Sequence, residues 1–118
     1  MPVNEITLTM TEKPTPSKVI SLAYGSYGEK NTMIFKLLNQ DKTPVDLSNT
    51  TQKIRLYDVR KKINIFTKNC IAIDASKGIT KYTPTSDDFA FTRKNYMRIS
   101  VESEHSKEFS EEALLWIV

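Results

Sequence analysis

This sequence of 118 residues has very little of the chemistry on which enzymes and metal sites depend. It contains one cysteine, Cys70, and one histidine, His105. A single cysteine excludes a disulfide within the chain and a zinc site built from several cysteines. It also agrees with folding in a reducing cytosol. A nucleophile or an imidazole base has only these two residues to use, so we expect a non-enzymatic protein with no cofactor.

Long apolar runs are also missing. The longest, residues 113–118, is far short of the roughly 20 residues that a membrane-spanning helix needs. The first thirty residues carry no basic segment followed by an apolar core, so we expect neither a signal peptide nor contact with a membrane.

A helical period of 3.6 residues is absent, and alternation with a period of two runs through most of the chain. Apolar residues occupy every second position at 6–10, 33–38 and 96–101, with Ile34 and Leu38 on the second face of the middle segment, and turn-forming residues separate such segments. This pattern predicts an all-β protein, an immunoglobulin-like β-sandwich of about eight to ten short antiparallel strands.

The first strand stands apart from the others in the sequence. Ile6, Leu8 and Met10 form one face of it, and Pro14 and Pro16 follow. Two prolines interrupt a sheet ladder, so we expect residues 1–17 to be a strand arm with a linker and residues 18–118 to be the sandwich domain. The arm is a candidate to pair with the sheet edge of a neighbouring subunit.

Charge is distributed unevenly along the chain. Residues 53–68 hold six basic side chains and one acidic one, a net charge of +5, and residues 102–112 hold five acidic side chains and one basic one, a net charge of −4. The candidate interaction residues Arg60, Lys61 and Lys62 lie at a predicted hairpin tip. The two segments are either complementary assembly surfaces or ordinary solvated faces. The acidic segment and the lack of a nucleic-acid motif argue against nucleic-acid binding.

Three residues are predicted to shape turns. Asp46 and Asp74 can accept hydrogen bonds from the backbone that follows them, and Gly78 fits a left-handed position. Asp87 and Asp88 suit the first turn of a short helix opened by Ser86.

These aspartates do not have the spacing of a calcium loop, so we predict no metal site. His105, next to Glu104 and close to Glu108, is expected to be a solvated surface residue, and Cys70 a small core residue.

Trp116 lies in the apolar run that ends the chain. If residues 114–118 form a strand, alternate side chains are buried and exposed. The tryptophan is then either part of the core or a contact residue on an outward face.

Three segments in order resemble a known family. Residues 35–49 are similar to its opening strand, proline-containing turn and Val-Asp-Leu-Ser motif, and residues 71–82 to its Ile-x-Asp-x-x-x-Gly hairpin. Residues 86–101 are similar to its closing segment. The chain resembles the N-terminal domain of baseplate upper proteins from tailed phages of Gram-positive hosts, whose immunoglobulin-like domains attach receptor-binding machinery to the virion.

This resemblance implies a structural protein of the virion, made in the host cytoplasm, that contacts other virion proteins and is present in several copies or as a homo-oligomer. An anchor domain that decorates the capsid or holds a head fibre is one alternative. A bacterial surface or carbohydrate-binding β-sandwich is another, although the sequence shows no signal peptide.

Overall fold

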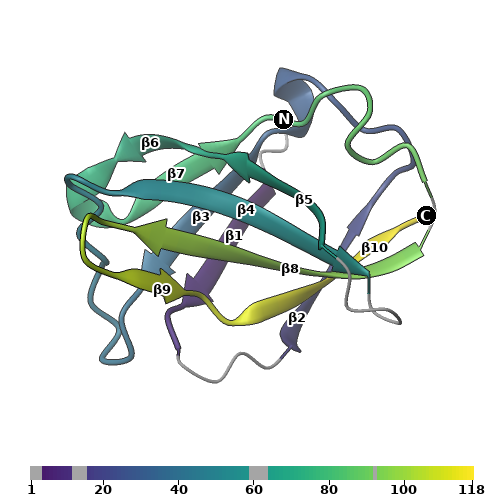
Figure 1. The fold of residues 1–118 in the computed structure, drawn as a ribbon. Helices are drawn as coiled ribbons and strands as arrows, with labels where there is room; N and C mark the ends of the chain where they lie inside the picture. The colour runs from purple at the N-terminus through teal and green to yellow at the C-terminus, as the bar shows by residue number, and fades with distance from the viewer. Residues whose placement is uncertain (1–3, 12–15, 59–63, 92) are drawn as a thin grey trace.

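The computed structural model describes residues 4–11, 16–58, 64–91 and 93–118, and these residues form strands and turns (Figure 1). In chain order the elements are β1 (Asn4–Thr9), β2 (Pro16–Leu22), the 3₁₀ turn η1 (Glu29–Asn31), β3 (Met33–Leu38), β4 (Thr51–Asp58), β5 (Asn64–Asn69), β6 (Ile71–Asp74), the 3₁₀ turn η2 (Ala75–Lys77), β7 (Ile79–Tyr82), β8 (Arg93–Glu102), β9 (Lys107–Phe109) and β10 (Glu112–Ile117). Within this part of the chain no helix is of the length and apolarity required to cross a membrane.

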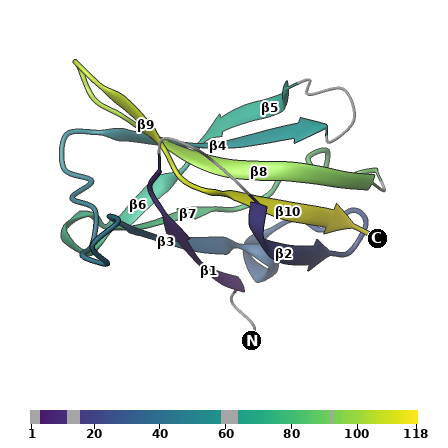
Figure 2. The ribbon, with the colours of Figure 1, turned by 90° about the horizontal axis from the view of Figure 1, so that it is seen from below.

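The strands form two sheets that pack face to face (Figure 2). One sheet has four strands in the order β1-β3-β7-β6, and the other has six, in the order β2-β10-β8-β4-β5 with β9 beside β8. The chain passes from the second sheet to the first at Cys70, between β5 and β6. The predicted all-β sandwich is confirmed.

Two of the strand pairs run parallel, which the sequence analysis did not expect. β1 pairs with β3 in parallel, and β2 pairs with β10 in parallel. The expectation of antiparallel strands throughout was wrong because alternation shows which side chains are buried and not which strand lies alongside. β1 and β2 lie in different sheets, so each takes a partner far along the chain, and no tight turn imposes the antiparallel direction.

The core lies between the sheets and is made by the alternation that the sequence shows. Met33, Phe35 and Leu37 of β3 have no exposed surface, and neither do Ile54 and Leu56 of β4. Their neighbours in sequence face outward or are partly buried, as expected for a sheet with one covered face. The inward faces of β1, β8 and β10 add further buried residues, so the core is made by strands of both sheets.

β1 is part of this sandwich. Ile6, Leu8 and Met10 are buried in the core, and the Met10 amide donates to the Leu38 carbonyl at 2.8 Å. The next amide, that of Thr11, donates to the carbonyl of Phe109, so the end of β1 contacts both sheets.

This placement differs from the expected arm, and the division expected at residue 17 falls inside β2. Burying the apolar face of a strand lowers the free energy of the folded chain. Pairing with β3 of the same chain allows β1 to bury its apolar face. The candidate interaction residues of the arm therefore lie in the core of this chain.

Candidate docking surface

The outer face of the six-stranded sheet carries a row of large side chains that crosses four strands. Leu114 of β10 lies opposite Val19 of β2 and, on its other side, opposite Tyr96 of β8. Tyr96 in turn lies opposite Tyr57 of β4. We call these four residues the aromatic row. Val19 is 67% exposed and the other three are partly exposed. A continuous apolar and aromatic strip of this kind on a solvent face is typical of a protein contact surface.

Arg98 lies beside this row and is held between two aromatic rings. Its guanidinium carbon is 5.1 Å from the centre of the Tyr57 ring and 4.1 Å from that of Phe109. Its Nε and Nη2 atoms donate to the Tyr57 hydroxyl at 3.2 and 2.9 Å. These contacts fix a side chain that is otherwise rich in rotamers, so its charge has a defined place on the surface.

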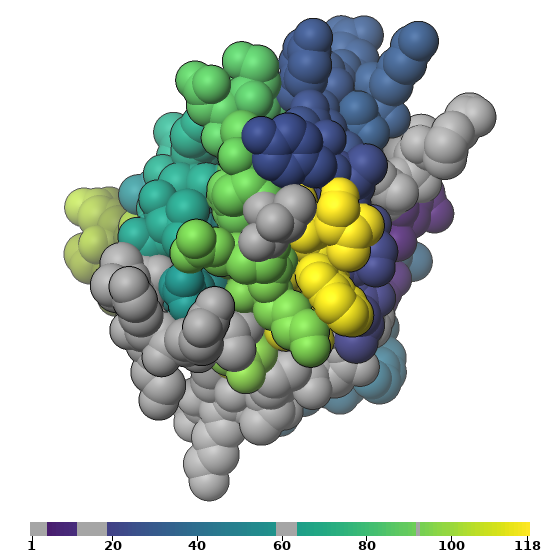
Figure 3. Space-filling model, turned by 90° about the vertical axis from the view of Figure 1, so that its right-hand side faces the viewer, coloured from purple at the N-terminus to yellow at the C-terminus, as the bar shows by residue number. Residues whose placement is uncertain are grey.

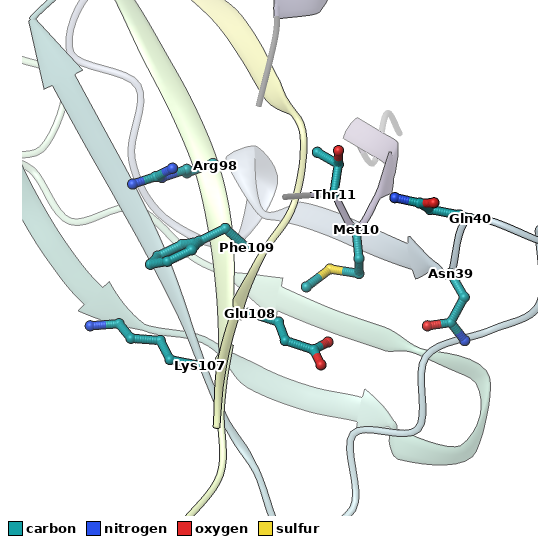
Figure 4. Close-up of a pocket in the computed structure, with 8 residues that line it drawn as sticks. All are labelled: Met10, Thr11, Asn39, Gln40, Arg98, Lys107, Glu108 and Phe109. Carbon is teal, nitrogen blue, oxygen red and sulfur yellow. The ribbon is translucent and has the colours of Figure 1, made fainter. Parts of the chain in front are cut away.

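A hollow of about 430 Å³ lies on one side of Arg98, where the end of β1, the β3–β4 connection and β9 meet. Figure 4 shows Arg98, Phe109 and Lys107 on one side of β9, and Glu108, Met10 and Asn39 on the other. A second hollow of about 300 Å³ is lined by Tyr57, Asp58, Tyr96, Arg98 and Glu112. Arg98 lines both hollows.

The basic and acidic segments meet within this chain. Glu102 Oε2 is 3.6 Å from Lys53 Nζ and 3.3 Å from Arg55 Nη2. Burial acts to raise the pKa of Glu102, but the hydrogen bond from Ser100 and the charge of Lys53 outweigh it, and the pKa lies below its usual range. Glu102 therefore offsets one of these two positive charges on the outer face of the sheet. Arg60, Lys61 and Lys62 lie outside the described residues.

Trp116 faces outward from β10 and is 42% exposed. Lys94 Nζ lies 4.5 Å from the centre of its ring. Next to it the chain ends beside the loop that follows β2, where the Tyr24 amide donates to the Val118 carbonyl at 2.8 Å. Figure 3 shows the yellow C-terminal residues between the blue atoms of that loop and the green atoms of the segment leading into β8. Tyr24 and Val118 are exposed, so large apolar side chains lie on the surface at this end of the sandwich.

Asp88 has a structural role that the sequence analysis missed. Its carboxylate is buried, where it accepts hydrogen bonds from the Tyr82 hydroxyl, from Lys68 Nζ and, at 2.9 Å, from the Thr85 amide. Burial acts to raise the pKa of Asp88, but these donors outweigh it and leave the pKa below its usual value. Burial, and then Asp88 itself, raises the pKa of Tyr82.

The short helix expected after Pro84 is a turn in the structure. The residue that caps this turn is Asp88, whereas the sequence analysis predicted Ser86. Asp88 reaches back to the amide of Thr85, three residues earlier, and Ser86 is exposed. The Thr-x-x-Asp spacing is the signal that points to this contact, because it is the pattern of a capping box.

The candidate ligands for an ion do not converge. Among the described residues no group of three or more histidine, cysteine, aspartate or glutamate side chains lies close enough to hold a metal. His105 Nε2 lies 4.0 Å from Glu104 Oε2, and both side chains are almost fully exposed. Cys70 is partly buried, and burial raises the pKa of its thiol to about 12, so at neutral pH it is not a thiolate.

A family model described as "BppU N-terminal domain" matches residues 2–118. The chain belongs to this family. BppU is a phage baseplate protein, so membership in this family makes the chain a structural component of a phage baseplate, and hence of the virion, that contacts other virion proteins.

A solved structure, the "N-terminal domain of phage TP901-1 ORF48", has the same fold with a TM-score of 0.70 and 13% sequence identity, over 98% of each chain. No curated protein matches the sequence.

The turns of this chain are held by side chains near the positions that the sequence analysis predicts. Asp46 Oδ1 accepts from the Ser48 amide at 2.9 Å, and this bond, with one from the Ser48 side chain, lowers the pKa of Asp46. Asp74 Oδ1 accepts from Ser76 Oγ at 2.9 Å. Gly78 has a φ of +70° at the end of η2.

Gly78 also lies too close to neighbouring backbone to carry a side chain. A Cβ there would be 2.5 Å from the Leu37 carbonyl oxygen, so Gly78→Ala is expected to lower the free energy of unfolding by about 2 kcal/mol. Gly25→Ala is the matched control, because Gly25 has a similar φ of +73° and open space around it. Urea unfolding should show about half the loss for the control, and equal losses would contradict the role of the close contact.

Proposed function

We propose that this domain docks host-recognition components onto the tail baseplate, without enzymatic activity. Membership in the BppU N-terminal domain family supports the baseplate role. The outer face of the six-stranded sheet supports docking, because the aromatic row and Arg98 form a pre-ordered surface of the composition found at the centres of protein interfaces.

The observation that carries the proposal is the fixed Arg98 between Tyr57 and Phe109, next to a row of exposed and partly exposed large side chains. Ordered side chains of this kind also favour an interface, because side chains that are already ordered lose less conformational entropy on binding.

Two further surfaces belong to the proposal. Trp116 is a candidate contact residue, and so are Arg60, Lys61 and Lys62 on the basis of their sequence. Several copies of the domain in one particle would use these surfaces at different contacts. Neither nucleic acid nor a membrane is part of the proposal.

The experiment is to locate the domain in the intact particle. Purified virions are labelled with a gold-conjugated antibody raised against residues 1–118 and imaged by electron microscopy. Label at the tail tip is the expected result. Label on the head would replace the proposal with the alternative of a capsid-decorating or head-fibre anchor domain, and label on the surface of the host cell alone would favour a bacterial surface module.

A further inference from the structure

We propose that the outer face of the six-stranded sheet binds a carboxylate-bearing segment of another protein, and that Arg98 is the anchor for its carboxylate. This inference rests on the proposed docking function and names the chemistry of the partner.

The first observation is that Arg98 is positioned for a carboxylate and has none. Its guanidinium is fixed by Tyr57 and Phe109, yet no carboxylate of the described residues lies within ion-pair distance of it. Glu102, on the same face, is in contact with two other cations. The Tyr57 hydroxyl occupies the edge of the guanidinium formed by Nε and Nη2. The other edge, formed by Nη1 and Nη2, presents a pair of donors whose geometry matches a carboxylate.

The second observation is the charge of this face. Five cations lie on its strands and two carboxylates accompany them: Lys53, Arg55, Lys94, Arg98 and Lys107 with Glu102 and Glu112. The surplus is positive, and the complementary partner surface is negative.

The third observation favours a protein segment over a nucleic acid. Glu108 lines one of the two hollows beside Arg98, and Asp58 and Glu112 line the other. A nucleic acid would bring a phosphate at every nucleotide to these carboxylates, whereas a peptide places uncharged residues beside them and carries its carboxylate to Arg98. Asn39 and Gln40 line the larger hollow and offer both donors and acceptors, which suit a peptide backbone. The aromatic row continues from the smaller hollow and provides apolar contact for residues beside the carboxylate.

The test uses a defined probe with the whole chain. A fluorescein-labelled peptide of twelve residues, with alternating glutamate and tyrosine, is titrated with the protein and followed by fluorescence anisotropy. Arg98→Gln is expected to weaken binding about tenfold or more, the range for a hydrogen-bonded pair of opposite charges. Arg98→Lys should bind the peptide more weakly than the unchanged protein and more tightly than Arg98→Gln, because lysine keeps the positive charge and lacks the paired donors of the guanidinium.

The matched control is Lys36→Gln, which removes one positive charge from the outer face of the four-stranded sheet. It should bind the peptide as the unchanged protein does. Melting curves of all variants show whether each is folded, and the Arg98→Lys variant keeps the test decisive if Arg98→Gln does not fold.

Three results would overturn the inference: equal binding by the Arg98→Gln and Lys36→Gln variants, tighter binding of a dT12 oligonucleotide than of the peptide, or an Arg98-dependent self-association that makes a second copy the partner. The particle-labelling experiment is independent of these results. Label on the head with Arg98-dependent peptide binding would reject the baseplate docking role alone, and label on the tail with no effect at Arg98 would reject this inference alone.

Discussion

Replacing Leu8 with alanine is expected to lower the free energy of unfolding by about 3–5 kcal/mol, the cost of a cavity at a fully buried leucine. Leu8 lies in β1, opposite Leu37 of β3, between the two sheets. The loss corresponds to a fall in Tm of about 10–20 °C for a domain of this size. Thermal unfolding followed by circular dichroism measures it.

Glu5→Ala in the same strand is the matched control, because Glu5 is exposed and its removal leaves no cavity. Its Tm should stay within about 2 °C of the original, as for an ordinary surface change. If Leu8→Ala also leaves Tm unchanged, β1 does not contribute to the core in solution, and the alternative of an arm that pairs with a neighbouring subunit regains its place.

The second large effect is expected at Asp88. Asp88→Ala leaves the buried Tyr82 hydroxyl and the Thr85 amide without their acceptor, and each unsatisfied group costs about 1–3 kcal/mol. Lys68 is partly exposed and can turn to water, so we expect a total loss of about 3 kcal/mol. Asp87→Ala is the control, since Asp87 is exposed beside it. Urea denaturation of the two variants measures the difference, and equal midpoints would contradict the role of Asp88.

The same carboxylate sets a direction for the pH dependence. The pKa of Asp88 is lowered in the folded protein, so its contribution to stability is complete above the unfolded value of about 3.9 and is lost as the pH falls through the folded pKa. The difference in stability between the original protein and Asp88→Asn should therefore shrink below about pH 4. A difference that grows in acid would mean that the pKa is raised instead.

The sequence predicts well where the strands lie in the chain, but it predicts poorly which strands pair with each other. The alternation at 33–38 and 96–101 corresponds to β3 and to the greater part of β8. Alternation arises from one covered face and is local, so it can be read without knowing the partner. The parallel partners of β1 and β2 depend on which edge each sheet leaves open, and that is decided by the whole topology.

The functional face shows a similar division. The charge of residues 53–68 is visible in the sequence, but Arg98, Tyr57 and Phe109 come from three strands and meet only through the register of β4, β8 and β9. The spacing of Asp88 from Thr85 predicts its contact with the Thr85 amide. The same residue also fits the first turn of a short helix, which is the interpretation that the sequence analysis chose. Residues far apart in the sequence carry the candidate interface, so one sequence alone does not bring them together.

The parallel pairing of β2 with β10 has a mechanical consequence. These strands lie side by side over six paired positions, with the start of β2 and the end of β10 at opposite ends of the pair. Tension between those two points pulls the strands past each other, so their hydrogen bonds bear the load together instead of opening one after another. Such an arrangement resists extension far better than a hairpin pulled apart from its open end, which suits the docking role proposed above, in which the domain would bear tension.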